Sequence, residues 1–250
     1  MNDVWIPMPR YKLRKSLVKR LIKQYDLKGN SLELGYGAGD MLLLYAKAGM
    51  VAEGYDFSSM AYDNASYRIN QTIFKDQITL LEQVQAVKEQ YYHCLFAFEV
   101  LEHIEEDEAA LLNWKHYLKA NGYLIMSVPA HERKWGASDI AVGHYRRYEK
   151  HALEKKLTKA GFKVHTVWSY GYPLTIALDY ALHKNAQKQL DAAKITDKAS
   201  LSKLSGIDRK PSLANKILAS DLFLSPFYLL QSVFLNTDLG SGYLVVAQKQ

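Results

Sequence analysis

The stretch Ser31–Asp40 reads SLELGYGAGD, and it decides how the rest of the chain folds. Its residues Leu32–Leu34 are typical of a short buried strand, and glycines follow at positions 35, 37 and 39. The next residues, Met41–Ala48, have the length and composition of a helix. Glycines at a strand-to-helix turn accept positive φ and let a ligand approach the backbone closely. The helix N-terminus adds unpaired N–H groups and a positive dipole end, so the stretch predicts a site for a polar or anionic ligand.

A second strand supplies a matching acid. The apolar run Val51–Tyr55 ends in Asp56, about 20 residues after Gly35, where an acid can accept both hydroxyls of a ribose. The glycines are spaced G-x-G-x-G, whereas dinucleotides with a pyrophosphate favour G-x-G-x-x-G. Glu33, in the strand before the turn, also disfavours a phosphate. The pattern indicates a nucleoside-binding βαβ unit, and the alternative is a glycine turn without a ligand.

The composition indicates a folded protein of the cell interior. The chain has 250 residues, enough for one large α/β domain or a domain with an insertion, and 48% of them are hydrophobic. The single cysteine, Cys94, excludes a disulfide framework and suits a reducing compartment. The N-terminus lacks the apolar core of a signal peptide, and no apolar stretch reaches the roughly 18 residues that span a bilayer. We therefore expect a soluble cytoplasmic protein.

Charge is unevenly distributed along the chain, whose net charge is +6. Residues 10–23 carry basic side chains and no acid, within a helical pattern from Tyr11 to Tyr25 that places lysines and arginines on its outer side. Residues 99–108, by contrast, are rich in acids. The basic helix predicts an anionic partner, or else a solvated helix face.

The remaining sequence alternates strands and helices. Apolar runs typical of strands are Ile78–Leu81, Tyr91–Val100, Tyr123–Val128 and Phe162–Tyr170, with helices expected at about 58–70, 105–119 and 149–160. Asn121 and Gly122 are expected to end the second of these helices. Residues 171–240 then interrupt the pattern before a last strand, Tyr243–Ala247. They contain apolar helical parts at about 173–190 and 212–235, joined by a linker rich in Lys, Ser and Asp.

Two segments resemble the class I S-adenosylmethionine-dependent methyltransferase superfamily. ELGYGAGD followed by GYDFS is similar to its motif I and second-strand acid, and FAFEVLEHIEED…YLKANGYLIMSVPAH is similar to its middle part. The resemblance implies an α/β fold with a Rossmann-like, mostly parallel, seven-stranded sheet and helices on both faces, here with a helical insertion before the last strand. We accordingly expect a donor-binding domain of residues 1–170 and 241–250, and an insertion of residues 171–240 that covers the substrate.

The resemblance implies S-adenosylmethionine as the cofactor. The residues expected to bind it are Glu33, Gly35, Gly37, Gly39, Asp56, Phe57, Gln83 and Glu99. Many relatives carry an aspartate after the third strand that reaches the adenine amino group, and here Glu82 or Gln83 takes that place. Phe57 follows the ribose acid, so it either contacts the adenine face or packs in the core. Glu99 stands at the carboxyl end of a central strand, where ligands bind in open α/β sheets.

Residues 130–148 form a long connection, and connections of this length inside a domain usually have a function. Because they follow the carboxyl end of a strand, we expect a lid over the methyl donor. Their segment SDIAVGHYRRY, with the N-terminal PMPRYKLRK, is similar to a bacterial branch of the superfamily without a settled substrate. The candidate catalytic residues are His103 and His144, as bases, and Arg146. Arg146 or Arg147 could clamp a phosphate or carboxylate of the substrate, while the other pairs within the lid.

Glu99, Glu102 and His103 form the string E-x-x-E-H, and they share one face if a helix begins at Glu99. Carboxylates this close repel each other unless one is protonated or a cation lies between them. The string binds a divalent ion in ubiquinone-pathway O-methyltransferases and in small-RNA 2′-O-methyltransferases, where a later loop histidine completes the site. The resemblance thus implies a Mg²⁺ or Mn²⁺ site of Glu99, Glu102, His103 and His144. The alternative is that Glu102 pairs with a lid arginine such as Arg146, while His103 binds the substrate or acts as the base.

The leading function is methyl transfer from S-adenosylmethionine to an oxygen of a small or lipid-linked metabolite. RNA methylation is an alternative in which the basic N-terminal helix follows phosphates. A third possibility is a non-catalytic protein that binds S-adenosylmethionine to regulate a partner. A lipid-linked substrate would bring the protein to the inner face of the membrane as a peripheral contact.

Overall fold

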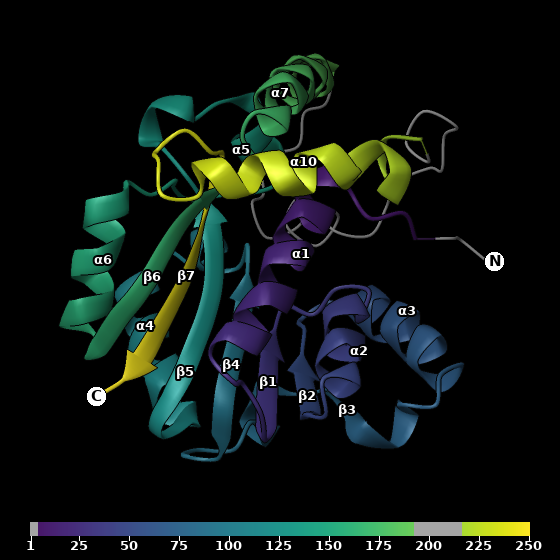
Figure 1. Cartoon of the computed structure of the whole chain (residues 1–250), viewed down its shortest axis with the longest axis vertical. Helices are drawn as coiled ribbons and strands as arrows, with labels where there is room; N and C mark the ends of the chain where they lie inside the picture. Colours follow the sequence, from purple (N-terminus) through teal and green to yellow (C-terminus); the bar gives the residue numbers. More distant parts are fainter. Residues whose placement is uncertain (1–4, 193–216) are drawn as a thin grey trace.

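A twisted sheet with helices on both faces organises the computed structural model, which describes residues 5–192 and 217–250 (Figure 1). Its strand order is β3-β2-β1-β4-β5-β7-β6. The strands are β1 (Asn30–Leu34), β2 (Val51–Tyr55), β3 (Ile78–Leu81), β4 (Tyr92–Phe98), β5 (Leu118–Pro129), β6 (Phe162–Tyr170) and β7 (Gly242–Lys249). The pairings among β1–β5 are parallel, while β7 runs antiparallel to β5 and β6. The predicted Rossmann-like, mostly parallel sheet is confirmed.

Two apolar cores lie on opposite faces of this sheet. One face is covered by α1 (Pro9–Gln24), α2 (Asp40–Lys47) and α3 (Ser59–Asn70), and the other by α4 (Asp107–Tyr117) and α6 (Lys150–Lys159) (Figure 1). Successive side chains of β4 alternate between the cores, since Phe96 packs with the first group and Leu95 and Ala97 with the second. A strand buried on both faces reads as a continuous apolar run, as this one does.

The connection from α4 to β5 differs from the prediction. The helix ends at Tyr117, not at residues 121 and 122, and β5 already begins at Leu118. Leu118 is fully buried and pairs with Tyr92 of β4, so tertiary pairing extends the strand backwards. Asn121 lies within this strand with a φ of 59°. Asparagine tolerates that conformation, so the residue marks a bend in the strand and not the end of the helix.

The short helix η1 (Lys75–Gln77) leads into the amino end of β3. The remaining helices lie at or above the carboxyl ends of the parallel strands. They are the short helices η2 (Val84–Ala86), η3 (Leu101–His103), η4 (Glu132–Lys134) and α5 (Ala137–Ala141), followed by α7 (Leu174–Ala192) and α10 (Asp221–Phe234). In Figure 1, α10 crosses above α1 and α7 lies above α5. Gln231 of α10 donates from Nε2 to the carbonyl of Leu13 in α1, at 3.2 Å.

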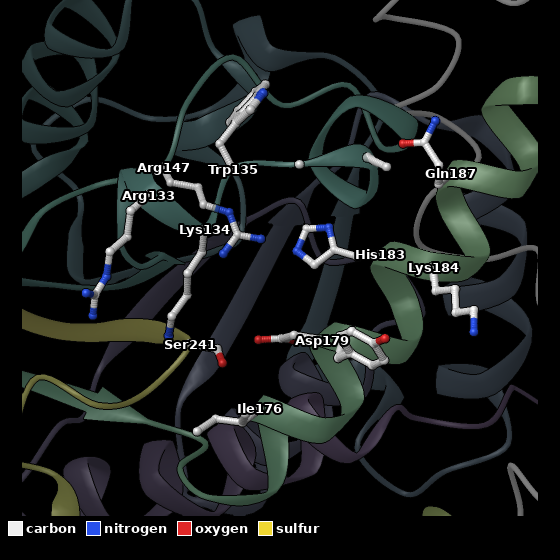
Figure 2. A pocket seen from close by; sticks show the side chains of 13 residues that line it. Arg133, Lys134, Trp135, Arg147, Ile176, Asp179, His183, Lys184, Gln187 and Ser241 are labelled. Carbon is white, nitrogen blue, oxygen red and sulfur yellow. The ribbon is translucent and has the colours of Figure 1, made fainter.

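The segment between β6 and β7 thus contributes two described helices at this edge. The predicted linker and the start of the second helical part fall at 193–216, outside the described residues. A cavity lies between α7 and residues 133–137 (Figure 2). Over residues 5–192 and 217–250, no helix combines the length and apolar character required to cross a bilayer.

Candidate functional site

The three glycines of the turn after β1 differ in the space around them: one position is open and two are tightly packed. Gly35, Gly37 and Gly39 have φ values of 73°, 52° and 73°. A Cβ at Gly35 would lie 2.7 Å from Val100, and one at Gly39 would lie 2.9 Å from Ala65. A Cβ at Gly37 would meet no atom of the described residues within 4 Å. Gly37 therefore keeps space open for a ligand, while the other two glycines allow the chain itself to pack.

Asp56, at the end of β2, is held beside that open position. Its carboxylate accepts hydrogen bonds from the backbone N–H of Gly37 at 2.9 Å and of Ser58 at 3.0 Å. Burial raises the pKa of Asp56, while these two backbone bonds act to lower it. Each oxygen has a backbone partner and keeps a further lone pair. A fixed acid above an open backbone cradle fits the ribose of a nucleoside.

Phe57 and Gln83 lie beyond the same edge of the sheet. The side chain of Phe57 is 54% exposed, so the alternative that it packs in the core is wrong. The end of β3 pairs with the end of β2 through Leu81 and Tyr55, which brings Gln83 to the side of Asp56 and Phe57. Gln83 is exposed. The predicted contact of both residues with adenine stays a prediction, and an exposed aromatic ring beside the ribose acid is what such a contact needs.

Glu33 and Asp40 stand on either side of the glycine turn in the sequence. Glu33 is buried, and its Oε2 has no hydrogen-bond partner among the described residues. Burial raises its pKa well above the ordinary value, against the opposing effect of Arg14. Asp40, the first residue of α2, accepts hydrogen bonds from the Tyr11 hydroxyl at 2.9 Å and from Lys15 at 2.5 Å. The helix α1 is therefore fastened across the glycine turn.

Glu99 is held by two arginines of α1. Arg10 and Arg14 lie 3.2 and 3.4 Å from its carboxylate oxygens, and the Ser127 and Tyr170 hydroxyls donate to Oε1 at 2.7 and 3.2 Å. Burial alone would raise the pKa of Glu99, but the two arginines and Ser127 lower it to about 2. Glu99 itself has a φ of 57°, a strained conformation for this residue.

This arrangement corrects two predictions. Arg10 and Arg14 point into the protein and do not belong to a solvated outer face of α1. Glu99 does not join a metal site, because four side chains of the chain itself already use its carboxylate. Its predicted direct contact with the cofactor stays a prediction. The sequence signal for Arg10 and Arg14 was the segment PMPRYKLRK, which the resemblance singled out without giving it a role.

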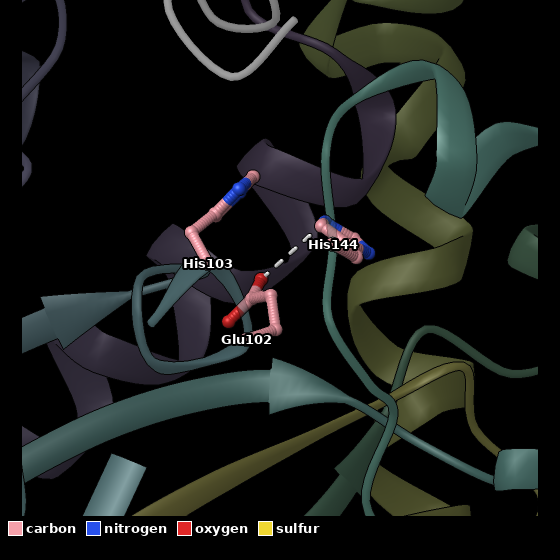
Figure 3. A group of neighbouring side chains, drawn as sticks. All are labelled: Glu102, His103 and His144. Carbon is pink, nitrogen blue, oxygen red and sulfur yellow. Dashed lines mark ion pairs between the residues drawn. The ribbon is translucent and has the colours of Figure 1, made fainter. Parts of the chain in front are cut away.

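Glu102, His103 and His144 come together at the carboxyl end of β4 (Figure 3). One ligand atom from each lies within 4.8 Å of the others. Glu102 is fully buried, and neither of its oxygens has a hydrogen-bond partner among the described residues. Burial, reinforced by the charge of Glu99, raises the pKa of Glu102 well above its ordinary value. The rings of His103 and His144 meet edge to face at 4.7 Å, and burial lowers the pKa of His103 to about 4.

Asp139 orients His144, and sequence reasoning missed this role. Its Oδ1 lies 2.9 Å from Nδ1 of His144, while Nε2 of the same ring lies 3.8 Å from Glu102. Asp139 is itself buried and paired with Arg147 at 2.8 Å. An aspartate on one ring nitrogen leaves the other free to accept a proton or bind a cation. The site therefore holds one carboxyl and two imidazoles, and this donor set fits a divalent transition metal.

The segment 130–148 brings His144 to this position because both of its ends are anchored. Ala130 and Tyr148 form a parallel bridge, and the N–H of Tyr145 donates to the carbonyl of Glu102 at 2.8 Å. Arg146 points elsewhere, since its guanidinium lies 2.9 Å from Asp107 and donates to the carbonyl of Glu105 at 2.6 Å. Arg146 is therefore removed from the catalytic residues. The alternative in which it pairs with Glu102 is also wrong.

Comparison with known proteins places this geometry in a family. A family model described as a methyltransferase domain matches residues 8–167. No curated protein matches the chain. A Galdieria sulphuraria protein assigned as a sarcosine dimethylglycine methyltransferase has a similar structure, with a TM-score of 0.63, 13% identity, and coverage of 96% of this chain and 87% of that one.

Two further solved structures are similar. An S-adenosylmethionine-dependent methyltransferase from Mesorhizobium loti gives a TM-score of 0.55 at 13% identity, over 95% of this chain and 96% of that one. Phosphoethanolamine N-methyltransferase 2 from Haemonchus contortus, in complex with S-adenosylmethionine, gives 0.57 at 16% identity, over 94% of this chain and 52% of that one. Identities this low show the fold alone. The family match, the open cradle at Gly37 and the fixed Asp56 agree, and the chain belongs to the class I S-adenosylmethionine-dependent methyltransferases.

Proposed function

We propose that the chain methylates an oxygen of a small or lipid-linked acceptor, whose hydroxyl binds between Glu102 and His144. The observation that carries this proposal is the carboxyl of Glu102, which is fully buried and, among the described residues, hydrogen-bonded at neither oxygen. A buried polar group without a partner costs about 1–3 kcal/mol, so such a group is kept where a ligand supplies the partner. Here the missing partner is a hydroxyl or a cation.

The residues around this carboxyl suit transfer to an oxygen. The sulfonium donor carries an activated methyl group, so the protein has to align the acceptor, exclude water and handle one proton. Asp139 accepts the Nδ1–H of His144, which leaves the lone pair of Nε2 available on the Glu102 side. A hydroxyl placed there donates to Nε2 as the methyl group is transferred, and His144 acts as the general base.

A divalent cation is the second way to satisfy this cluster. Glu102, His103 and His144 would hold it, and a bound cation lowers the pKa of an attached hydroxyl. Without Glu99, the set has one carboxylate and two imidazoles, which suits Mn²⁺ better than the oxygen-seeking Mg²⁺. Asp139 would then serve as the partner that orients the His144 ligand.

The charges of α1 favour a small acceptor over RNA. Besides Arg10 and Arg14, Lys12 pairs with Asp221 at 2.7 Å and Lys15 with Asp40 at 2.5 Å. The basic side chains that seemed to form a phosphate-binding stripe are thus largely used inside the protein. A purely regulatory protein would have no use for a buried Glu102 whose oxygens accept no hydrogen bond from the described residues.

The test is methyl transfer from labelled S-adenosylmethionine into fractions of a cell extract, followed by assays of variants on the labelled fraction. We expect label in the small-molecule or lipid fraction, and a loss of about 100-fold or more in rate for Glu102→Gln and His144→Asn, as for removal of an acid–base group. His151→Gln, on the exposed side of α6, is the matched control and should keep full activity. All variants should bind S-adenosylhomocysteine like the wild type.

Other outcomes decide between the alternatives. Label in RNA would refute the small acceptor, and full activity of both site variants would refute the assigned site. After dialysis against EDTA, activity restored by Mn²⁺ but not in Glu102→Gln supports the cation. Undiminished activity after EDTA refutes the cation and leaves His144 as the base.

A further inference from the structure

A cavity of about 780 Å³ is lined by residues other than the glycine turn and Asp56 (Figure 2). One wall comes from residues 133–137, at the start of the segment that follows β5, and another from Arg147 at its end. The opposite wall is one face of α7, because the lining positions 176, 179, 180, 183, 184 and 187 recur at helical spacing. The two walls are joined where the Ser138 hydroxyl lies 3.0 Å from Nδ1 of His183.

The lining of this cavity has an excess of positive charge. It includes four cationic side chains, Arg133, Lys134, Arg147 and Lys184, and one acid, Asp179. Arg147 is neutralised by Asp139, but no ion pair within the described residues involves the other three cations. Lys134 donates to a neutral group, the carbonyl of Gly240, at 3.1 Å. Burial lowers the pKa of Lys134, and Arg147, Arg133 and Arg10 lower it further against the effect of Asp179. An anion would therefore be stabilised at this point.

The same cavity has a wall of apolar side chains that are exposed to solvent. Trp135, Ile176 and Tyr180 line it with exposed fractions of 40%, 51% and 72%. Large exposed apolar side chains that gather in a concave site mark a place for a ligand. Aromatic rings beside cationic groups suit a ligand with an apolar or aromatic body and a charged end.

One arginine separates this cavity from the end of β4. Ser241 lines the cavity, and its carbonyl accepts a hydrogen bond from Nη2 of Arg10 at 3.0 Å. The same Nη2 lies 3.2 Å from Glu99. On the other side, Arg147 of the cavity wall binds Asp139, which orients His144. A ligand in the cavity thus lies next to the residues assigned to methyl transfer.

We infer that this cavity binds the part of the methyl acceptor that is not methylated, and that this part is an anionic group, phosphate or carboxylate, on an apolar body. That the ligand is the methyl acceptor rests on the proposed function. The anion site itself rests on the charges and the lining of the cavity. Lys134 and Arg133 contact the anion, and Trp135 and Tyr180 contact the apolar body. The acceptor's hydroxyl then reaches His144 from the other end of the molecule.

The experiment measures binding of four probes to the full chain by quenching of Trp135 fluorescence and by calorimetry. The probes are phenyl phosphate, benzoate, benzyl alcohol and inorganic phosphate. We expect the two aromatic anions to bind at least tenfold more tightly than benzyl alcohol, and phenyl phosphate at least tenfold more tightly than inorganic phosphate. Trp135→Phe should abolish the fluorescence change, which places the probe in this cavity.

Variants test the assigned contacts. Lys134→Gln and Arg133→Gln should each weaken phenyl phosphate binding at least fivefold, Lys134→Arg should retain it, and Lys155→Gln on exposed α6 is the matched control. Binding of S-adenosylhomocysteine should not change in any of them. Equal binding of benzyl alcohol, or anion binding that Lys134→Gln and Arg133→Gln leave intact, would overturn the anion site. If S-adenosylhomocysteine binds and no aromatic anion does, this inference fails alone. Anion binding with no methyl transfer to any fraction would instead count against the proposed function.

Discussion

At the scale of single residues, the three glycines of the turn have different roles that their common spacing conceals. Gly35 and Gly39 lack a Cβ because Val100 and Ala65 occupy that space, whereas no described residue occupies it at Gly37. The spacing predicts that a turn exists and that a ligand is near. Which glycine faces the ligand depends on residues that are 26 or more positions away in the sequence, and spacing alone cannot show this.

Gly37→Val tests that assignment, with Gly49→Val as its matched control. Gly37 and Gly49 have positive φ values of 52° and 86°, and both have open space where a Cβ would lie. Gly49, however, lies after α2 and outside the glycine turn. Each substitution should therefore cost a similar backbone strain of about 1–2 kcal/mol in unfolding free energy. By calorimetry, Gly37→Val should lose S-adenosylhomocysteine binding by at least tenfold, while Gly49→Val binds normally. Equal loss in both variants would show that strain, and not occupied space, is the cause.

At the scale of elements, Asp107 fastens the end of the 130–148 segment to two helices. This first residue of α4 accepts hydrogen bonds from Lys156 of α6 at 2.5 Å and from the Tyr148 hydroxyl at 2.9 Å, and it pairs with Arg146. Burial would raise the pKa of Asp107, but the bonds from Lys156 and Tyr148 lower it below the ordinary value. The segment thus ends in a fixed charge cluster, which explains why Arg146 does not reach the site.

The lowered pKa of Asp107 predicts how stability depends on pH. A carboxyl whose pKa is lower in the folded state stabilises that state above its ordinary pKa of about 3.9, and the contribution disappears as the pH falls through the lower native value. Urea unfolding of wild type and Asp107→Asn should therefore differ most near pH 7 and converge as the pH falls below the lowered native pKa of Asp107. Glu108→Gln, a change to the exposed neighbour that pairs with Lys159, is the control and should cost little at any pH. A constant difference across the pH range would contradict the prediction.

At the scale of the whole molecule, the sequence predicts the sheet well, and it predicts the grouping of Glu102, His103 and His144 only in part. Strands such as Tyr92–Phe98 are predictable because both of their faces are buried, which leaves a continuous apolar run. Glu102, His103 and His144 could be named from a motif. The separation of Glu99 from that group could not be predicted from the motif, because it depends on arginines about 90 positions earlier in the chain. The charged cavity combines residues 133–137, Arg147, residues of α7 and Ser241, so no local pattern indicates it.

The contact between Arg10 and Ser241 has a consequence for the time at which the protein becomes active. Arg10 is synthesised before both of its partners, which are Glu99 after β4 and Ser241 just before β7, 231 positions further along the chain. During translation the first helix therefore emerges long before the strand that completes its setting, and β7 must still insert between β5 and β6. Contacts of such large sequence separation form late. In a nascent chain, the contacts of Arg10 with Glu99 and Ser241 and the cavity beside α7 should therefore stay unformed until β7 has left the ribosome. An incomplete chain should then catalyse no methyl transfer.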